Sequence, residues 1–132
     1  MIIAGIDYSL TSPAICILNG DTWCWDNLTF YFLTDKPTRA KTYLDKIHGE
    51  RLQDWNHEAE RYCSIADWAK ELVIGCGDVA LEGYSYGSKG KVFNIAENTG
   101  ILKYKLYELS IPLTIYAPQA IKKFATTKGN AT

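Results

Sequence analysis

The sequence lacks three features that would each place it in a familiar class of protein. No part of its 132 residues approaches the run of about 20 apolar residues that a membrane-spanning helix needs, so no membrane association is expected. The N-terminus does not have the basic and apolar pattern of a signal peptide. Neither a GxGxxG sequence nor a P-loop occurs, which argues against a glycine-rich cradle for a nucleotide.

Cysteine and histidine are also sparse, and their spacing indicates neither a disulfide framework nor a zinc site. The four cysteines form no CxxC pair, and neither of the two histidines lies at zinc-site spacing from them. Cys16, Cys63 and Cys76 stand in apolar runs, as small core residues do. We therefore expect a protein of the reducing cytoplasm.

What is present is enough for one folded domain. An apolar fraction of 47% with 22% charged residues is typical of a globular protein rather than of a disordered chain. A chain of 132 residues can bury a sizeable core, so we expect a single domain over residues 1–132.

Charge is divided unevenly along the chain. Residues 1–78 carry seven Lys and Arg against twelve Asp and Glu, a net charge of −5, whereas residues 79–132 carry seven Lys, no Arg and three Glu, a net charge of +4. A basic half on a nearly neutral protein is consistent with a polyanionic partner. The alternative is that these lysines lie on ordinary solvated helix faces. For Lys103 and Lys105 this alternative competes with a role in binding a polyanion.

The first apolar run of the chain ends at a carboxylate. Ile2–Ile6 is short, apolar and rich in β-branched residues, which predicts a strand buried on both faces, and Asp7 ends it. Turn-forming residues follow, and a second strand is expected over Ala14–Leu18. A charge at the end of a buried strand needs a partner, a cation or a role in the turn. From the residues alone, a turn cap and a metal ligand are equally supported for Asp7.

Hydrophobic periodicity predicts the remaining elements. A third, antiparallel strand is expected over Asp26–Leu33, and Thr34–Glu50 is expected to be a long connection with a short helix near Ala40–Lys46. The later elements are expected to be the helix Arg51–Ile74, the strand Asp78–Leu81, the helix Val92–Leu109, the strand Pro112–Ala117 and the helix Pro118–Ala125.

The two long helices are expected to differ in their surroundings. The polar face of the first, which includes Arg61, Asp67 and Lys70, is expected to face solvent. The second is apolar around much of its circumference, so we expect it to pack against the sheet and, unless its whole apolar surface belongs to the core, against a partner subunit. Gly100 weakens that helix, and a close approach to the sheet would explain it.

A second strand also delivers a carboxylate at its end. Asp78–Leu81 leads to Glu82, and a glycine-rich segment with two tyrosines and two lysines follows. Glycine permits bends, a tyrosine ring can stack on a base, and a lysine can meet a phosphate. An ordinary glycine-rich turn is the weaker alternative, because aromatic and basic residues alternate here beside an acid.

The order of the elements and four short motifs resemble the ribonuclease H-like fold, and within it the RuvC-type Holliday junction resolvases, especially their bacteriophage and poxvirus-like relatives. The resemblance covers nearly the whole chain. It implies an α/β fold with a mixed five-stranded sheet, three strands antiparallel and then parallel ones, flanked by helices. The motifs are GIDYS (Gly5–Ser9), ALEGYSYG (Ala80–Gly87), NIAENTGILKYKL (Asn94–Leu106) and APQAIKKFATTKGNAT (Ala117–Thr132).

This resemblance implies a metal-dependent endonuclease that resolves four-way or other branched DNA, with Asp7 and Glu82 as catalytic residues. Hydrolysis of a phosphodiester needs an activated water and a stabilised leaving oxygen, and two Mg²⁺ ions about 3.5–4 Å apart can provide both. Parallel neighbouring strands would bring the two acids together, where a divalent cation relieves their repulsion. We expect Asp7 to bridge two Mg²⁺ ions and Glu82 to bind one, with Mn²⁺ as the other candidate metal.

The resemblance also implies contacts with DNA and with a second copy of the chain. Symmetric dimers suit a four-way substrate with two-fold symmetry, and we expect the Val92–Leu109 helix to form the dimer face. A bacteriophage protein would act in the cytoplasm of its bacterial host. The residues expected to contact DNA are Tyr84, Tyr86, Lys89, Lys91, Lys122, Lys123 and Lys128.

The sequence departs from this family after Glu108, where it has no further Asp or Glu. RuvC-type enzymes resemble one another in having one or two more acids on a last helix, so we expect a C-terminally truncated chain and an incomplete metal site. A catalytically idle junction-binding module therefore remains open beside the nuclease. A ribonuclease of the YqgF type is a further alternative, although Tyr8 and Ser9 follow the first acid where glycine and arginine would be expected. An actin-like ATPase domain would need a longer chain.

Overall fold

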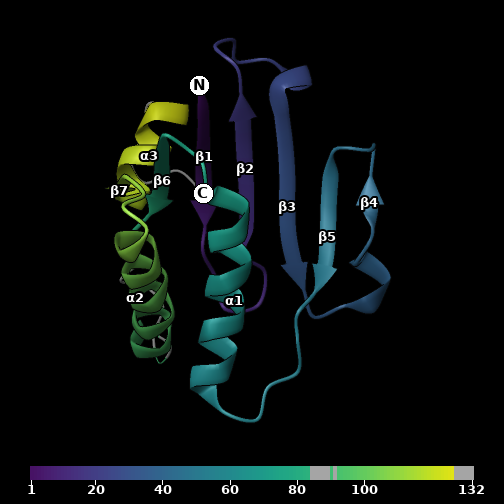
Figure 1. The fold of residues 1–132 in the computed structure, drawn as a ribbon, viewed down its shortest axis with the longest axis vertical. Helices are drawn as coiled ribbons and strands as arrows, with labels where there is room; N and C mark the ends of the chain where they lie inside the picture. Colours follow the sequence, from purple (N-terminus) through teal and green to yellow (C-terminus); the bar gives the residue numbers. More distant parts are fainter. Residues whose placement is uncertain (84–89, 91, 127–132) are drawn as a thin grey trace.

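A mixed sheet of seven strands lies at the centre of the computed structural model (Figure 1), which describes residues 1–83, 90 and 92–126. The strands stand in the order β4-β5-β3-β2-β1-β6-β7. The strands are β1 (Ile2–Asp7), β2 (Ala14–Asn19), β3 (Leu28–Thr34), β4 (Thr42–Tyr43), β5 (Ile47–Arg51), β6 (Asp78–Glu82) and β7 (Leu113–Tyr116). The helices are α1 (Glu58–Val73), α2 (Val92–Glu108) and α3 (Pro118–Thr126), with short 3-10 turns at Trp25–Asn27 and Pro37–Arg39. The predicted α/β class is confirmed.

The strand pairing has the predicted antiparallel and parallel parts. β1 pairs antiparallel with β2, and β2 pairs antiparallel with β3. On the other side of β1, β6 lies parallel to it, and β7 lies parallel to β6. Parallel neighbours need a crossover connection, and α2 supplies the one from β6 to β7. Both strands that carry the candidate acids are therefore in the middle of the sheet.

The core lies between the sheet and the two long helices, α1 and α2, which cover the same side of it (Figure 1). Neighbouring side chains of a strand point to opposite faces, so every second residue of β1 and β6 faces the helices. The buried core includes Ala4, Ile6, Ile15, Val79 and Leu81 of the sheet, Ile65, Ala69 and Val73 of α1, and Leu102 and Leu106 of α2. The remaining residues of β1 and β6 point to the other face, called the open face below.

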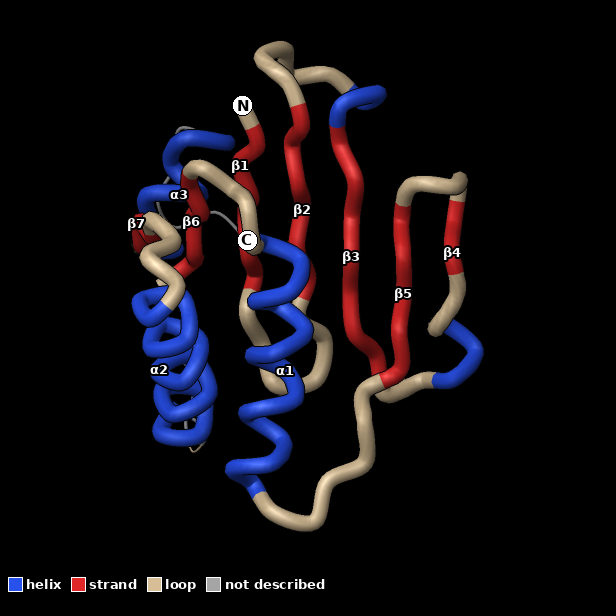
Figure 2. The backbone as a smooth tube through the Cα atoms, viewed as in Figure 1, coloured by secondary structure: helices blue, strands red, loops and turns tan. Residues whose placement is uncertain are grey.

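The prediction of five strands is wrong, because the segment expected to hold a short helix near Ala40–Lys46 forms the hairpin β4–β5 at the edge of the sheet (Figure 2). β5 pairs parallel with β3, so the backbone N–H and C=O groups on the outer edge of β3 have hydrogen-bond partners. Leu44 and Asp45 form the turn with positive φ angles of 52° and 55°. The Lys46 N–H closes this turn by donating to the Tyr43 carbonyl oxygen at 3.0 Å.

Gly49 of β5 fits more closely against its neighbours than its small size suggests. A Cβ atom there would lie 2.4 Å from the Phe32 ring and 2.8 Å from the Arg39 carbonyl oxygen. We expect Gly49→Ala to lower the free energy of unfolding by about 1–3 kcal/mol, because backbone atoms would have to move. Gly5→Ala is the matched control, since a Cβ there meets nothing within 4 Å. Urea unfolding measures both variants, and equal stabilities would contradict the packing of the hairpin against β3.

The helix α1 begins later than predicted, at Glu58 instead of Arg51. Arg51 is the last residue of β5. His57 caps the helix, because its Nδ1 accepts a hydrogen bond from the Ala59 N–H at 3.1 Å. Leu52, inside the predicted range of this helix, lies in the connection before it and still packs against the core. The periodicity thus identified the helix and misplaced its start.

Two predictions for residues on the helices are wrong, and part of a third is confirmed. Cys63 is exposed, although it was expected in the core. Gly100 makes no close approach to the sheet, because a Cβ there meets nothing within 4 Å. The helix α2 has two apolar stripes, and the one with Leu102 and Leu106 is buried in the core against the sheet, as expected. The other, called the exposed α2 stripe, consists of Phe93, Tyr104 and Tyr107, which are 78%, 62% and 82% exposed.

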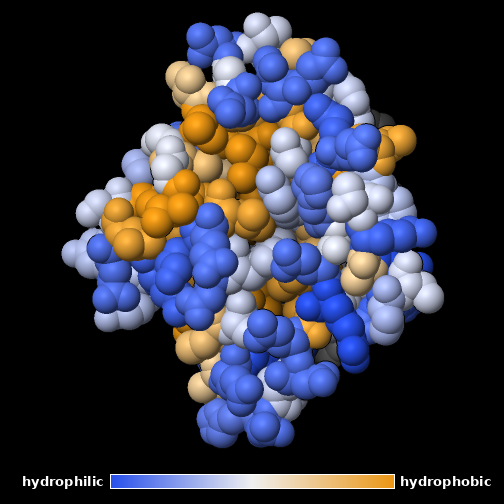
Figure 3. All heavy atoms as spheres, turned by 45° about the vertical axis from the view of Figure 1, so that its right-hand side comes forward, coloured by the Kyte–Doolittle hydropathy of each residue, from blue (hydrophilic) through white to orange (hydrophobic). Residues whose placement is uncertain are grey.

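Apolar side chains also reach the surface elsewhere. Figure 3, in which the β4 side of the molecule comes forward, shows hydrophobic residues in separate patches framed by hydrophilic ones. Large exposed side chains include Trp23, Trp25, Leu44 and Phe124. No helix in the described part of the chain has the length and apolar character needed to cross a membrane.

Candidate functional site

Asp7 and Glu82 stand next to one another at the ends of two neighbouring strands. The parallel strands β1 and β6 have Ile6 and Leu81 as their last registered pair, so the two acids occupy the following position. Ile6 and Leu81 are buried against the helices, and the alternation of side chains turns both acids to the open face. Neighbouring strands lie about 4.8 Å apart, a separation that a shared cation can bridge. The juxtaposition expected from the sequence is present.

An open cavity of about 720 Å³ lies on the open face, beside both acids. Asp7 is exposed and Glu82 is half-buried. Small side chains of the central strands and the two acids form the floor of the cavity, and aromatic and aliphatic side chains stand on either side. The floor residues are Gly5, Asp7, Ala14, Cys16, Ala80 and Glu82; Trp25, Phe30 and Phe32 stand on one side, and Tyr116 and Ile121 on the other.

Glu82 can also be reached from a second cavity. This cavity has a volume of about 310 Å³ and lies between α2 and the start of α3. Thr99, Lys103 and Gln119 line it together with Glu82. A lysine side chain therefore shares a cavity with one of the two acids, on the side of the site away from Asp7.

The electrostatics of the pair suit a cation. Neither Asp7 nor Glu82 forms a hydrogen bond or an ion pair with another described residue. Two carboxylates side by side repel each other, and carboxylate oxygens are preferred ligands of Mg²⁺ and Mn²⁺. Across the described ranges, no group of three or more Asp, Glu, His or Cys side chains could hold a metal ion. A cation at this pair would therefore need water and substrate to complete its ligands.

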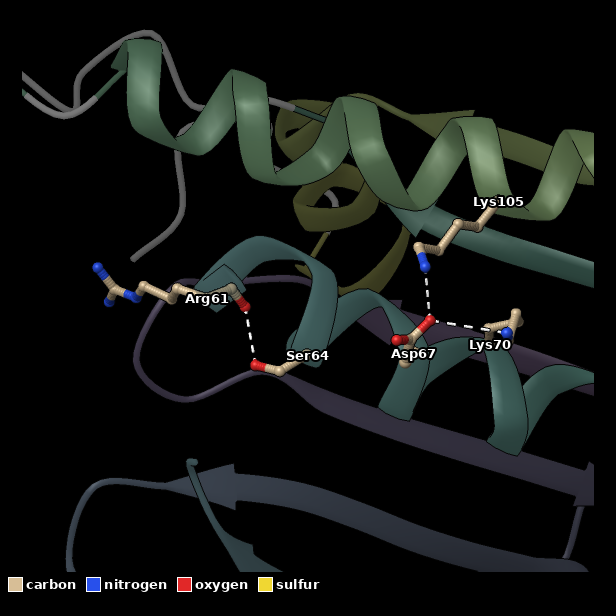
Figure 4. A network of polar contacts seen from close by, with 5 residues as sticks. All are labelled: Arg61, Ser64, Asp67, Lys70 and Lys105. Carbon is tan, nitrogen blue, oxygen red and sulfur yellow. Dashed lines mark hydrogen bonds and ion pairs between the residues drawn. The ribbon is translucent and has the colours of Figure 1, made fainter. Parts of the chain in front are cut away.

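On the helix side of the sheet, a polar network joins α1 to α2 (Figure 4). Lys105 of α2 donates a hydrogen bond of 2.5 Å to Asp67 of α1, and the Lys70 ammonium lies 3.6 Å from the same oxygen. The bond from Lys105 holds the pKa of Asp67 below its ordinary value of 3.8. The same bond raises the pKa of Lys105. The expectation that Asp67 faces solvent is thus only half right, because its side chain is 47% exposed but also contacts α2 through Lys105.

Tyr8, in the connection from β1 to β2, belongs to the core on the helix side of the sheet. It follows Asp7 directly, and its ring is part of the buried core. Its hydroxyl has no hydrogen-bond partner among the described residues. Burial, followed by the charges of Asp67 and Cys63, raises the pKa of Tyr8. Tyr8 therefore remains a neutral phenol at neutral pH and holds the end of β1 in place through packing.

We expect Asp67→Asn to lower the free energy of unfolding at pH 7 by about 1 kcal/mol, since the pair is partly exposed to solvent. The folded pKa of Asp67 is depressed, so its contribution is present above the ordinary pKa of 3.8 and is lost as the pH falls through the folded value. The stability gap to the unsubstituted chain should therefore close in acid. Urea unfolding at pH 7 and at acid pH measures it.

Asp54→Asn is the matched control for this prediction. Its side chain is 99% exposed and lies 4.0 Å from Arg51, so its loss should change the stability by less than about 0.5 kcal/mol. A gap for Asp67→Asn that stayed constant from pH 7 into acid would show that the ionised carboxylate is not the source of the stability.

The structure places only some of the residues predicted to contact DNA. Lys122 and Lys123 are exposed on α3, whose Ile121 lines the cavity beside the acids. Tyr84, Tyr86, Lys89, Lys91 and Lys128 lie outside the described residues.

Sequence reasoning missed the aromatic side of the open-face cavity. Trp25, Phe30 and Phe32 line it, and the Lys46 ammonium lies 5.4 Å from the centre of the Trp25 ring. The aromatic character of the Trp23–Phe32 segment was visible in the sequence. Its position beside the acids was not, because that position depends on the pairing of β2 with β3.

The fold is similar to those of known resolvases, although no protein-family model and no curated protein sequence matches this chain. Thermus thermophilus RuvC superposes with a TM-score of 0.66 at 17% identity, over 100% of this chain and 73% of RuvC. The same protein in complex with a Holliday junction substrate gives a TM-score of 0.62 at 15% identity, over 93% of this chain and 70% of that one.

The yeast mitochondrial Holliday junction resolvase Ydc2 is more distant. It gives a TM-score of 0.52 at 12% identity, over 95% of this chain and 54% of that one. At such identities the likeness shows a shared fold, and it leaves activity to be argued from the residues. The chain has the ribonuclease H-like fold, in the form found in RuvC and other Holliday junction resolvases.

Proposed function

We propose that this chain is a metal-dependent endonuclease that cuts branched DNA, with four-way junctions as its preferred substrate. The pair of Asp7 and Glu82 carries the proposal, because it brings two carboxylates together on one face at the ends of central parallel strands. The fold adds support, since RuvC shares it and its structure has been determined with a Holliday junction substrate. Neither support alone would distinguish a nuclease from another member of this broad fold.

In this proposal, Asp7 is the bridging carboxylate and Glu82 is the ligand of one ion. Asp7 is the more exposed of the two, and a carboxylate can offer an oxygen to each of two ions. Two bound Mg²⁺ ions would supply an activated water and stabilisation of the leaving oxygen, and Mn²⁺ has similar ligand preferences. The chain itself holds the two acids in register through the backbone pairing of β1 and β6, a more precise support than a loop.

Basic residues near the site would bind the phosphates of the DNA. Lys122 and Lys123 are exposed on α3, and residues 79–132 carry a net charge of +4. Contacts of this kind give affinity without reading the base sequence, and they weaken as the salt concentration rises. We therefore expect DNA binding to weaken strongly as the salt concentration rises. We also expect these lysines to recognise the shape of the DNA rather than its sequence.

A dimer through α2 is part of the proposal. The exposed α2 stripe presents aromatic side chains to solvent, which a monomer has little reason to keep. Beside it lies a groove of about 460 Å³ between α1 and α2, lined by His57, Tyr62, Glu97 and Tyr104 among others. A two-fold dimer would pair this surface with itself and would present two identical sites to a four-way junction.

A junction-binding module without cleavage is the second candidate. The observation that favours it is the number of ligands, since the described residues offer two carboxylates at the site and no cluster of three metal-binding side chains. Two acids bind a divalent cation more weakly than a fuller set does. Binding of DNA would still be possible, because it depends on the basic residues.

Cleavage of synthetic DNA distinguishes these candidates. The experiment compares a four-way junction, a plain duplex and an RNA–DNA hybrid, each with Mg²⁺, with Mn²⁺ and with EDTA. Metal-dependent cutting of the junction alone is the expected result. Tight binding of the junction without cutting would favour the second candidate, and cutting of the RNA strand alone would favour a ribonuclease.

A further inference from the structure

A lysine and two aromatic rings form a first compact set on the open face. The Lys46 ammonium lies 5.4 Å from the centre of the Trp25 ring. That ring lies 5.8 Å from the ring of Phe30, at an interplanar angle of 34°. Trp25 is 49% exposed, so much of its surface remains available to a ligand.

A second set with the same composition lies beside the first. The Lys41 ammonium lies 5.2 Å from the centre of the Tyr43 ring, and that ring lies 6.3 Å from Phe32 at an angle of 33°. Phe30 and Phe32 are alternate residues of β3, so both sets stand on the same face of the sheet. The aromatic–lysine surface is defined as Trp25, Phe30, Phe32, Lys41, Tyr43 and Lys46.

This surface is continuous with the candidate site. Asp7 pairs with Ala14 of β2, and Ala14 pairs with Phe32 of β3. Phe32 is thus two strands from Asp7, a distance of about 10 Å. Trp25, Phe32 and Asp7 line the same cavity. One ligand could therefore touch the aromatic rings and the acids together.

The segment around this surface is positively charged, although residues 1–78 as a whole carry a net charge of −5. Residues 36–51 carry five Lys and Arg and two acids, a net charge of +3. Two of the five, Lys41 and Lys46, already lie over aromatic rings. An aromatic ring next to a cation matches a nucleotide, because the base stacks on the ring and the phosphate meets the cation. An apolar protein segment would not need these lysines.

We infer that the aromatic–lysine surface binds an unpaired strand of nucleic acid. In this arrangement a base stacks on Trp25, and phosphates meet Lys46 and Lys41. The strand then runs across the open face toward Asp7 and Glu82, and this last step rests on the proposed function. Branched DNA offers unpaired bases where its arms meet, so the surface would select for opened junctions over plain duplex.

The test measures binding of a fluorescein-labelled oligo(dT) of about 12 nucleotides, a length within the usual site size for a single strand. Fluorescence anisotropy in EDTA keeps metal binding and cleavage out of the measurement. Trp25→Ala should weaken binding about tenfold, as loss of one stacked base does. Lys46→Gln should lower the slope of log affinity against log salt by about 0.7, the value for one phosphate contact to a single strand.

Trp55→Ala is the matched control. Trp55 is 45% exposed and also has a cation over its ring, since the Arg61 guanidinium carbon lies 5.1 Å from its centre. It does not line the open-face cavity. This variant should bind the oligonucleotide as the unsubstituted chain does. Circular dichroism verifies that each variant is folded. If Trp25→Ala does not fold, the salt dependence of binding by Lys46→Gln still tests the inference.

The outcomes separate this inference from the proposed function. Equal binding by Trp25→Ala, Trp55→Ala and the unsubstituted chain would overturn the inference, even if junctions were cut. Loss of binding in Trp25→Ala alone would support it, even if no junction were cut. A change from dimer to monomer in Trp25→Ala on size-exclusion chromatography, without a change in binding, would overturn it and show an interface between copies of this chain instead.

Discussion

An Asp7→Asn variant should bind a four-way junction as the unsubstituted chain does and cut it on the order of 10³-fold more slowly in Mg²⁺. Loss of a group that only supports a metal ligand already costs 10–100-fold in metal affinity or activity, and loss of a bridging ligand should cost more. Asparagine keeps the size of the side chain and removes the charge. Single-turnover cleavage, with binding measured separately in EDTA, provides the comparison. Glu82→Gln should lose activity to a similar extent.

Asp78→Asn is the matched control for these variants. Asp78 is exposed at the start of β6 and lies on the same face as Glu82, four residues from the strand end where the two acids meet. Its loss should leave the cleavage rate unchanged. Calorimetric titration with Mn²⁺ tests the same role of Asp7 if the unsubstituted chain proves not to cut DNA. Asp7→Asn should lose Mn²⁺ binding, and Asp78→Asn should keep it. Full activity or full metal binding in Asp7→Asn would contradict the assigned role of Asp7.

The position of the candidate site could be predicted from the sequence because it depends on strand order and side-chain parity. Ile2–Ile6 and Asp78–Leu81 are apolar runs that each end in one acid. Runs of that kind suit the buried middle of a sheet, where parallel neighbours align their carboxyl ends. The structure has this register, with Ile6 opposite Leu81, so both acids reach the same edge and the same face.

The hairpin β4–β5 could not be predicted in this way. β4 has only two residues, and β5 (IHGER) is mostly polar and contains a glycine, so neither shows the apolar pattern of a strand. β5 is stabilised by pairing with β3 and by the Phe32 ring beside Gly49, and β4 is stabilised by pairing with β5. The same limit explains why Asp67 was expected in solvent. Its partner Lys105 lies 38 residues away in the sequence, and only the packing of α1 against α2 brings the two together.

Tyr104→Glu should raise the dissociation constant of the proposed dimer more than about 100-fold, as measured by analytical ultracentrifugation. The exposed α2 stripe carries the aromatic residues that a two-fold interface would bury. In a symmetric dimer both copies would bury the new charge without a partner, at a cost of several kcal/mol. The monomer should keep its fold, since Tyr104 is 62% exposed.

Leu44→Glu is the matched control for this prediction. Leu44 is 75% exposed on the β4–β5 turn, so its substitution should leave the dimer intact. A single-cut junction, in which only one strand of the pair is nicked, should then accumulate with Tyr104→Glu, because one site acts without the other. An unchanged dimer in this variant would place the interface on another surface and leave the exposed α2 stripe to a different partner.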